Sequence, residues 1–245
     1  MRRGIAAGKL AVLGVILLAG LGGCVTRQPA PPAPGRTPAA HAAPSPLVGR
    51  RFDVIAADSQ LIVLVYRAGA LAAVGHNHVI ACHCLSGTVY VPRDPMHASF
   101  DLRLGVSQFT VDDPALRAAE HSPDFPAGVA PSAGQATRHN MLGAALLNAA
   151  KYPDIALRSA GLRPSPDGRH ADIVAQILVK LDGEWHSVAV PLRYEIRGDE
   201  IVASGEFPLR QTSLGLTPFS ALGGALQVKD GMKVALRLVA RSRGT

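Results

Sequence analysis

Alternation of apolar and polar residues is the feature that most limits how this chain can fold. In the segments 100–106 and 188–196, apolar side chains occupy every second position, and charged or small residues mostly fill the positions between them. In an extended strand this pattern puts one face toward a core and the other toward water. Similar segments can be placed at about 52–57, 60–68, 77–84, 87–92, 155–163, 171–181, 200–211 and 226–240. The chain is therefore predicted to be mainly β.

Turn residues separate several of these segments. Asp-Gly or Gly-Asp pairs stand at 167–168, 182–183, 198–199 and 230–231, and such a pair between apolar runs predicts a hairpin. Short hairpin connections make neighbouring strands antiparallel. So many antiparallel strands must close on themselves or form two layers to protect their edges.

A helical insertion interrupts the strands. Asp113 and Pro114 provide an N-cap and a first-turn proline for a short helix, and 138–150 places apolar residues on one helical face. The segment 122–134, rich in Pro, Gly and Ala, is expected to be a mobile loop. This layout predicts an antiparallel barrel of about eight strands with a helical insertion near one mouth.

The N-terminus has the features of an export signal. Arg2, Arg3 and Lys9 precede an apolar run that stops at Cys24. The run of about 14 residues is shorter than the roughly 20 needed to span a bilayer. Residues 21–24, Leu-Gly-Gly-Cys, resemble the lipobox of bacterial lipoproteins, which implies removal of 1–23 and a lipid on Cys24. An ordinary secretory peptide and an uncleaved anchor are the alternatives.

The lipid would place the chain in a bacterial envelope, and Val25 in place of aspartate resembles sorting to the periplasmic face of the outer membrane. Residues 24–47 contain seven prolines and few large apolar side chains, which is typical of an extended tether. A Pro-rich recognition segment is the competing interpretation. The folded domain is expected to occupy 48–245.

The charge balance does not indicate a nucleic-acid partner. The formal net charge is +7, and removal of Arg2, Arg3 and Lys9 with the leader leaves +4 on the mature chain. No dense stripe of Lys and Arg alternates with aromatic residues, as nucleic-acid binding would require. The oligomeric state is left open.

Four segments in the same order resemble the YceI-like family of lipid- and polyisoprenoid-binding proteins. They are a helix-to-strand junction with Tyr152-Pro153 at 146–159, a strand pair at 178–192, a late strand at 207–216 and a final hairpin at 228–234. The resemblance implies a lipocalin-like, exported barrel with an apolar cavity, which in some members holds a polyisoprenoid such as a quinone tail. It implies no catalytic residue and no enzyme. Under this interpretation the candidate cavity-lining residues are Leu64, Tyr66, Val79, Phe100, Leu102, Phe219 and Leu222.

The segment Gly75-His76-Asn77-His78-Val79 departs from that family and has three interpretations. His76, Asn77 and His78 could form a hydrogen-bonded network at a corner, or the two histidines could hold a metal with further donors such as Asp112, His121 or His139. The third interpretation is a direct role in binding a ligand headgroup. His78 and Cys82 would be some 13 Å apart along a strand, too far to share an ion. A metal is therefore not the favoured interpretation.

Cys82 and Cys84 are expected to be buried thiols, because residues two apart on a strand lie near the limit for a disulfide. A bridge between them is the alternative. The loop 215–224 carries Phe219 and Leu222, which either plug the barrel mouth or line a lipid entrance, and Ser220 lacks the setting of a nucleophile. The sequence thus favours an envelope lipoprotein that binds an isoprenoid-type molecule. A metal-binding or redox protein using His76 and His78 and a ligandless stress or scaffold protein are the rivals.

Overall fold

Residues 42–242 are described in the computed structural model, so the predicted signal peptide, the lipid on Cys24 and most of the tether lie outside the described residues. Two α-helices occur in this part, α1 (Pro114–Ala119) and α2 (Pro131–Leu142). The strands are β1 (Arg50–Val54), β2 (Gln60–Val65), β3 (Arg67–Ala68), β4 (His78–Cys82), β5 (Leu85–Val91), β6 (Ser99–Gly105), β7 (Thr110–Val111), β8 (Asp154–Pro164), β9 (Ile173–Leu181), β10 (Glu184–Arg197), β11 (Glu200–Arg210), β12 (Ser220–Ala221), β13 (Leu226–Val228) and β14 (Gly231–Arg241). Short 3-10 turns are η1 (Ala56–Asp58), η2 (Ala72–Val74), η3 (Pro95–His97), η4 (Val106–Gln108), η5 (Gln211–Leu214) and η6 (Leu222–Gly224).

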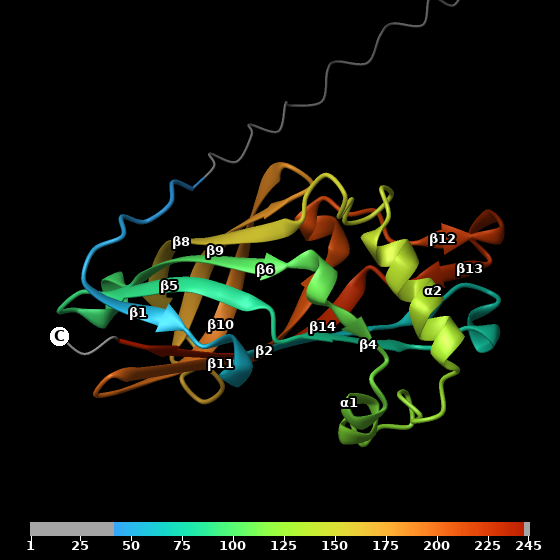
Figure 1. Ribbon diagram of the computed structural model, residues 1–245, viewed down its shortest axis with the longest axis horizontal. Coiled ribbons are helices and arrows are strands. Elements are labelled where there is room, and N and C mark those ends of the chain that lie inside the picture. Colours follow the sequence, from blue (N-terminus) through green and yellow to red (C-terminus); the bar gives the residue numbers. More distant parts are fainter. Residues whose placement is uncertain (1–41, 243–245) are drawn as a thin grey trace, which may run out of the picture. The chain divides into compact units, whose positions relative to one another are not determined.

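The large sheet closes into an antiparallel barrel (Figure 1). Its order is β1-β5-β6-β8-β9-β10-β11-β14, and β14 pairs again with β1 through Val54 opposite Ala240. The first half of β14 pairs instead with β2, which is followed in the sheet by β4 and β7. The predicted lipocalin-like, mainly β fold is therefore confirmed.

Three of the barrel strands are broken in the middle. β1 and β2 are two halves of one strand separated by η1, and β6 and β7 are separated by η4 in the same way. At the first break the buried Ser59 hydroxyl accepts a hydrogen bond from the Val239 amide at 2.9 Å and donates to the Ile55 carbonyl at 2.8 Å. This side chain keeps the backbone groups paired where the ladder is interrupted.

The third break, between β4 and β5, shows that the prediction of two free thiols is wrong. Cys82 and Cys84, which separate β4 from β5, are joined by a disulfide and are not free thiols. Their Cα atoms are only 5.2 Å apart, because the chain bends here and does not continue as the straight strand assumed for 77–84. His83 lies between them, and its Nδ1 is 2.7 Å from the Ser59 carbonyl of the neighbouring break.

Hairpin turns follow the Gly and Asp signals of the sequence. Asp182 and Gly183 both adopt positive φ, 50° and 87°, in the two-residue turn between β9 and β10, as the favoured primed turns require. Gly198, also at positive φ, joins β10 to β11. The segment 226–240, expected as one strand, forms two strands. β13 joins a separate small sheet, and β14 begins at Gly231 after a turn.

The helical insertion differs from the prediction in its second helix. α1 begins as expected, with the Asp113 carboxylate accepting from the Ala115 and Leu116 amides. α2 spans Pro131–Leu142 and not 138–150, so it begins inside the segment expected to be a loop. Pro131 supplies the first helical position and Gly143 ends the helix, which leaves Leu146 and Leu147 in turns. Neither helix of residues 42–242 is long and apolar enough to cross a bilayer.

Candidate ligand cavity

A cavity of about 310 Å³ lies inside the barrel. Side chains from all of the long strands line it, together with residues from α2, from the turns after it and from η5. Only Tyr194 and Gln211 among the lining residues carry a polar side-chain atom. The interior is therefore an almost wholly apolar space.

Strand alternation produces this lining. On β10 the inward residues are Val188, Val190, Leu192, Tyr194 and Ile196, the apolar face identified from the sequence. On β2 the inward residues Leu61 and Val63 remain only half-buried although they lie mid-strand. Since neighbouring strands cover the edges of β2, this residual exposure indicates unfilled space.

The two ends of the cavity differ. At one end Met141 of α2 and Leu146, Leu214 and Leu216 close around the space. At the other end Ile196 lines the cavity and is itself 37% exposed. A lining side chain therefore reaches solvent at the end that carries Ile196.

Phe100 and Leu102 line this cavity from β6, whereas Leu64, Tyr66 and Val79 do not, which corrects the sequence-based list. Leu64 and Val79 face outward and pack with Phe125 in a second, smaller cluster. The sequence of β2 and its end, Leu-Ile-Val-Leu-Val-Tyr, is apolar at every position, so alternation could not show which set faces inward. Leu116 of α1 covers the outer set.

Phe219 and Leu222 were also candidates for the cavity lining, but both lie outside the cavity. They are 42% and 72% exposed, and the residues of this loop region that reach the cavity are Leu214 and Leu216. The interpretation of Phe219 and Leu222 as a plug of the barrel mouth is therefore wrong.

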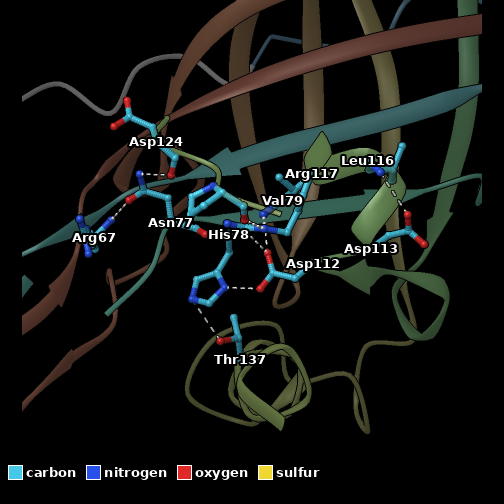
Figure 2. A network of polar contacts seen from close by, with 11 residues as sticks. Arg67, Asn77, His78, Val79, Asp112, Asp113, Leu116, Arg117, Asp124 and Thr137 are labelled. Carbon is cyan, nitrogen blue, oxygen red and sulfur yellow. Dashed lines mark hydrogen bonds and ion pairs between the residues drawn. The ribbon is translucent and has the colours of Figure 1, made fainter. Parts of the chain in front are cut away.

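A buried polar network lies outside the barrel wall, between β4, α1 and α2 (Figure 2). At its centre Asp112 accepts from His78 Nδ1 at 2.6 Å and from Arg117 Nη1 at 2.5 Å. The Val79 amide adds a third donor at 3.0 Å. Arg117, whose side chain is 0% exposed, also donates to the carbonyls of Asn77 and Pro126. The network fastens the helical insertion to the barrel.

Asn77 and His78 both belong to this region, but His76 is only its neighbour. The Asn77 side chain accepts from the Arg67 amide and donates to the Asp124 carbonyl, each at 2.9 Å. His78 Nε2 lies 3.3 Å from the Thr137 hydroxyl of α2. The His76 ring contacts the His78 ring edge-on at 5.8 Å between centroids. Arg117, buried and distant in the sequence from His78, had no local signal that could have identified it.

Solved proteins with a similar barrel share little sequence with this chain. Burkholderia cenocepacia BcnA aligns with a TM-score of 0.51 at 15% identity, over 76% of this chain and 99% of BcnA. A polyisoprenoid-binding domain from Saccharophagus degradans, implicated in plant cell wall breakdown, gives 0.50 at 9% identity, over 78% and 98% of the two chains. A Campylobacter jejuni YceI protein gives 0.44 at 10% identity, over 65% and 82%.

The chain has the same antiparallel barrel fold as BcnA and the Saccharophagus degradans domain. The likeness predicted from four short motifs is thus confirmed at the level of the fold. No family model matches the sequence, and no curated protein does either.

The polar network of this barrel holds charged side chains, and its described residues are not arranged as a metal site. Among the described residues no group of three or more His, Cys, Asp and Glu side chains is placed to hold an ion. Both ring nitrogens of His78 already face partners, Asp112 and Thr137. The arrangement therefore orients a histidine and compensates a buried arginine.

Asp112 makes this network sensitive to acid. Burial opposes ionisation of its carboxyl group, but hydrogen bonds from His78, the Val79 amide and Arg117 outweigh this effect and hold its pKa below the ordinary value. A depressed pKa in the folded state stabilises the protein above the unfolded value of about 4, and this stability is lost as the pH falls toward the folded pKa.

We expect the Asp112→Asn variant to be less stable than the native chain at pH 6, and the difference to shrink as the pH falls below about 4. Urea unfolding at a series of pH values measures it. Asp167→Asn is the control, because Asp167 also has a lowered pKa but lies on an exposed loop, where water screens its pairing with His170. A gap for Asp112→Asn that stays constant down to pH 2 would contradict this assignment.

Proposed function

We propose that this protein binds one apolar, isoprenoid-type molecule inside its barrel, as an envelope protein held to a membrane by a lipid on Cys24. The observation that carries the proposal is the apolar cavity of about 310 Å³ along the barrel interior. Eight-stranded barrels are just wide enough to be filled by side chains or to hold one slender ligand.

The size and the lining of the cavity suit such a ligand. Small-molecule pockets generally begin at about 300 Å³, and apolar cavities of about 150 Å³ already take up benzene. Each methylene group that leaves water contributes about 0.8 kcal/mol. Because this gain needs no directed polar contact, a branched hydrocarbon chain can be held by a lining of Leu, Val and Ile.

The two polar lining residues give the ligand a possible direction. Tyr194 belongs to the same strand end as the exposed Ile196, so a polar headgroup at this end would lie near its hydroxyl. Gln211 lies at the opposite end, where its side-chain amide donates to the Lys229 carbonyl at 2.8 Å. A ligand with one polar end and a long apolar tail fits this arrangement.

One of the solved structures supports this ligand class. The Saccharophagus degradans domain with the same fold is described as binding a polyisoprenoid. A carrier of this kind needs no catalytic group, and we propose a binding protein and not an enzyme. The envelope location rests on the lipobox-like residues 21–24 and on the proline-rich segment that follows them.

The test is mass spectrometry of organic extracts from the purified protein, with metal analysis of the same sample. A copurified prenyl lipid in near-stoichiometric amount supports the proposal. Stoichiometric zinc or copper without lipid supports the rival metal protein that uses His76 and His78. Neither lipid nor metal supports the ligandless scaffold.

The membrane anchor has its own expected result. Replacing Cys24 by serine should abolish incorporation of labelled palmitate, because the thiol is the atom that carries the lipid in bacterial lipoproteins. Cys82→Ser and Cys84→Ser together form the matched control, since these two cysteines are bonded to each other inside the domain. Labelling that survives Cys24→Ser would overturn the lipoprotein assignment.

A further inference from the structure

Four large apolar side chains of the described residues are exposed within one small region. Val74 and Leu222 are 71% and 72% exposed, and Leu71 and Phe219 are 41% and 42% exposed. All four lie in or next to the loops of the three-stranded sheet β12-β13-β3. We call Leu71, Val74, Phe219 and Leu222 the apolar tip.

The small sheet brings the two loops together. β13 pairs with β12 on one side and with β3 on the other, so the turn after β12 and the turn after β3 lie at the same end of the sheet. The Leu71 amide donates to the Ala225 carbonyl at 2.8 Å across the two turns. In Figure 1 this sheet projects beyond α2, away from the chain's C-terminal end.

The backbone holds Leu222 outward at an energetic cost. Leu222 has φ 52°, and Gly223 and Gly224 continue at positive φ. A left-handed conformation is strained for a residue with a Cβ atom, and a bulky leucine there is uncommon. Glycine would fit this exposed position without strain, so a leucine here keeps an apolar side chain at the surface in spite of the backbone conformation.

The two segments that carry the apolar tip contain basic but no acidic side chains. Neither 67–76 nor 211–229 contains an aspartate or glutamate, and both segments carry a cation, Arg67 and Lys229, at the base of the small sheet. The acidic neighbours Glu120 and Asp124 belong to the segment behind Tyr66, and Asp230, which follows Lys229, accepts hydrogen bonds from Thr212. Exposed apolar side chains with cations behind them match the interface of an anionic bilayer.

We infer that the apolar tip inserts into the surface of an anionic phospholipid bilayer. The two loops that form it continue directly from cavity-lining residues, Val65 before β3 and Leu216 before Phe219. The docked tip therefore places the α2 end of the cavity, the end closed by Met141 and Leu214, next to the lipid phase. The inference adds a docking surface to the proposed function and rests on that function for the anchor on Cys24.

Tryptophan quenching by brominated lipids tests the docking. The chain has a single tryptophan, Trp185, so Trp185→Phe gives a silent background for Leu222→Trp. The intact lipidated protein is reconstituted in vesicles that contain brominated phosphatidylcholine and phosphatidylglycerol. We expect the introduced tryptophan to lose most of its emission, and to recover part of it when phosphatidylglycerol is omitted.

Ile196→Trp in the same background is the matched control, because Ile196 is also exposed but lies at the opposite end of the barrel. Flotation of the vesicles reports the Cys24 anchor separately from tip insertion. Equal quenching at both sites, or none at position 222 in floated vesicles, would overturn the inference. The same variant is also measured without vesicles. If the introduced tryptophan becomes buried as the protein concentration rises, the tip contacts a second copy of the chain instead of a membrane.

Discussion

Replacing Arg117 by methionine should lower the free energy of unfolding by about 3–5 kcal/mol, the usual range for removing one partner of a buried ion pair. The loss has two parts. Asp112 would remain buried without its guanidinium partner, and the carbonyls of Asn77 and Pro126 would lose their donors. Methionine keeps much of the side-chain volume, so a cavity adds little to this effect. Urea unfolding at pH 7 measures the change.

Arg241→Met is the matched control. Arg241 pairs with Glu200 and Asp58 at about 3 Å, but its side chain is 52% exposed, and exposed pairs contribute about 1 kcal/mol or less. If the two variants lose similar stability, the network around Asp112 does not fasten the helical insertion as described here.

Replacing Ala203 by phenylalanine should lower the amount of copurified apolar ligand roughly tenfold. Ala203 lines the cavity from β11, so a phenyl ring there occupies ligand space. Displacing about two methylene groups at about 0.8 kcal/mol each corresponds to about a tenfold loss of affinity. Quantitative mass spectrometry of organic extracts measures the ligand per mole of protein.

Ala189→Phe provides the control for this substitution. Ala189 lies on the neighbouring strand β10 but is exposed on the outer face, so ligand content should stay unchanged. The delipidated Ala203→Phe protein should unfold at the same temperature as the native chain or above it, because the ring fills empty space. Unchanged ligand content in Ala203→Phe would place the ligand elsewhere.

The barrel could be predicted where alternation was strict and turn chemistry was clear. The inward face of β10 follows from the alternation of apolar residues at every second position. The turn at Asp182-Gly183 follows from the preference of these residues for positive φ. β2 could not be assigned a face, because its residues are apolar on both sides. The reason is tertiary: Phe125 and Leu116, far along the chain, cover its outer surface.

The polar network and the disulfide show the same limit. Gly75-His76-Asn77-His78 marked a polar region, but the partners that define it, Asp112, Arg117 and Thr137, come from three later segments. The prediction of free thiols at Cys82 and Cys84 depends on the spacing of a straight strand. The break between β4 and β5 brings the two residues closer than that spacing. Pairings that depend on where the sheet bends need the three-dimensional structure.

The central claim is that the barrel interior holds an apolar molecule in place of its own side chains. Native mass spectrometry of the lipidated protein, purified in mild detergent from the membranes in which it is made, tests this most directly. We expect an added mass of one prenyl-type molecule per chain that organic extraction removes. A spectrum that shows only the polypeptide and its anchor, in every membrane preparation, would contradict the claim.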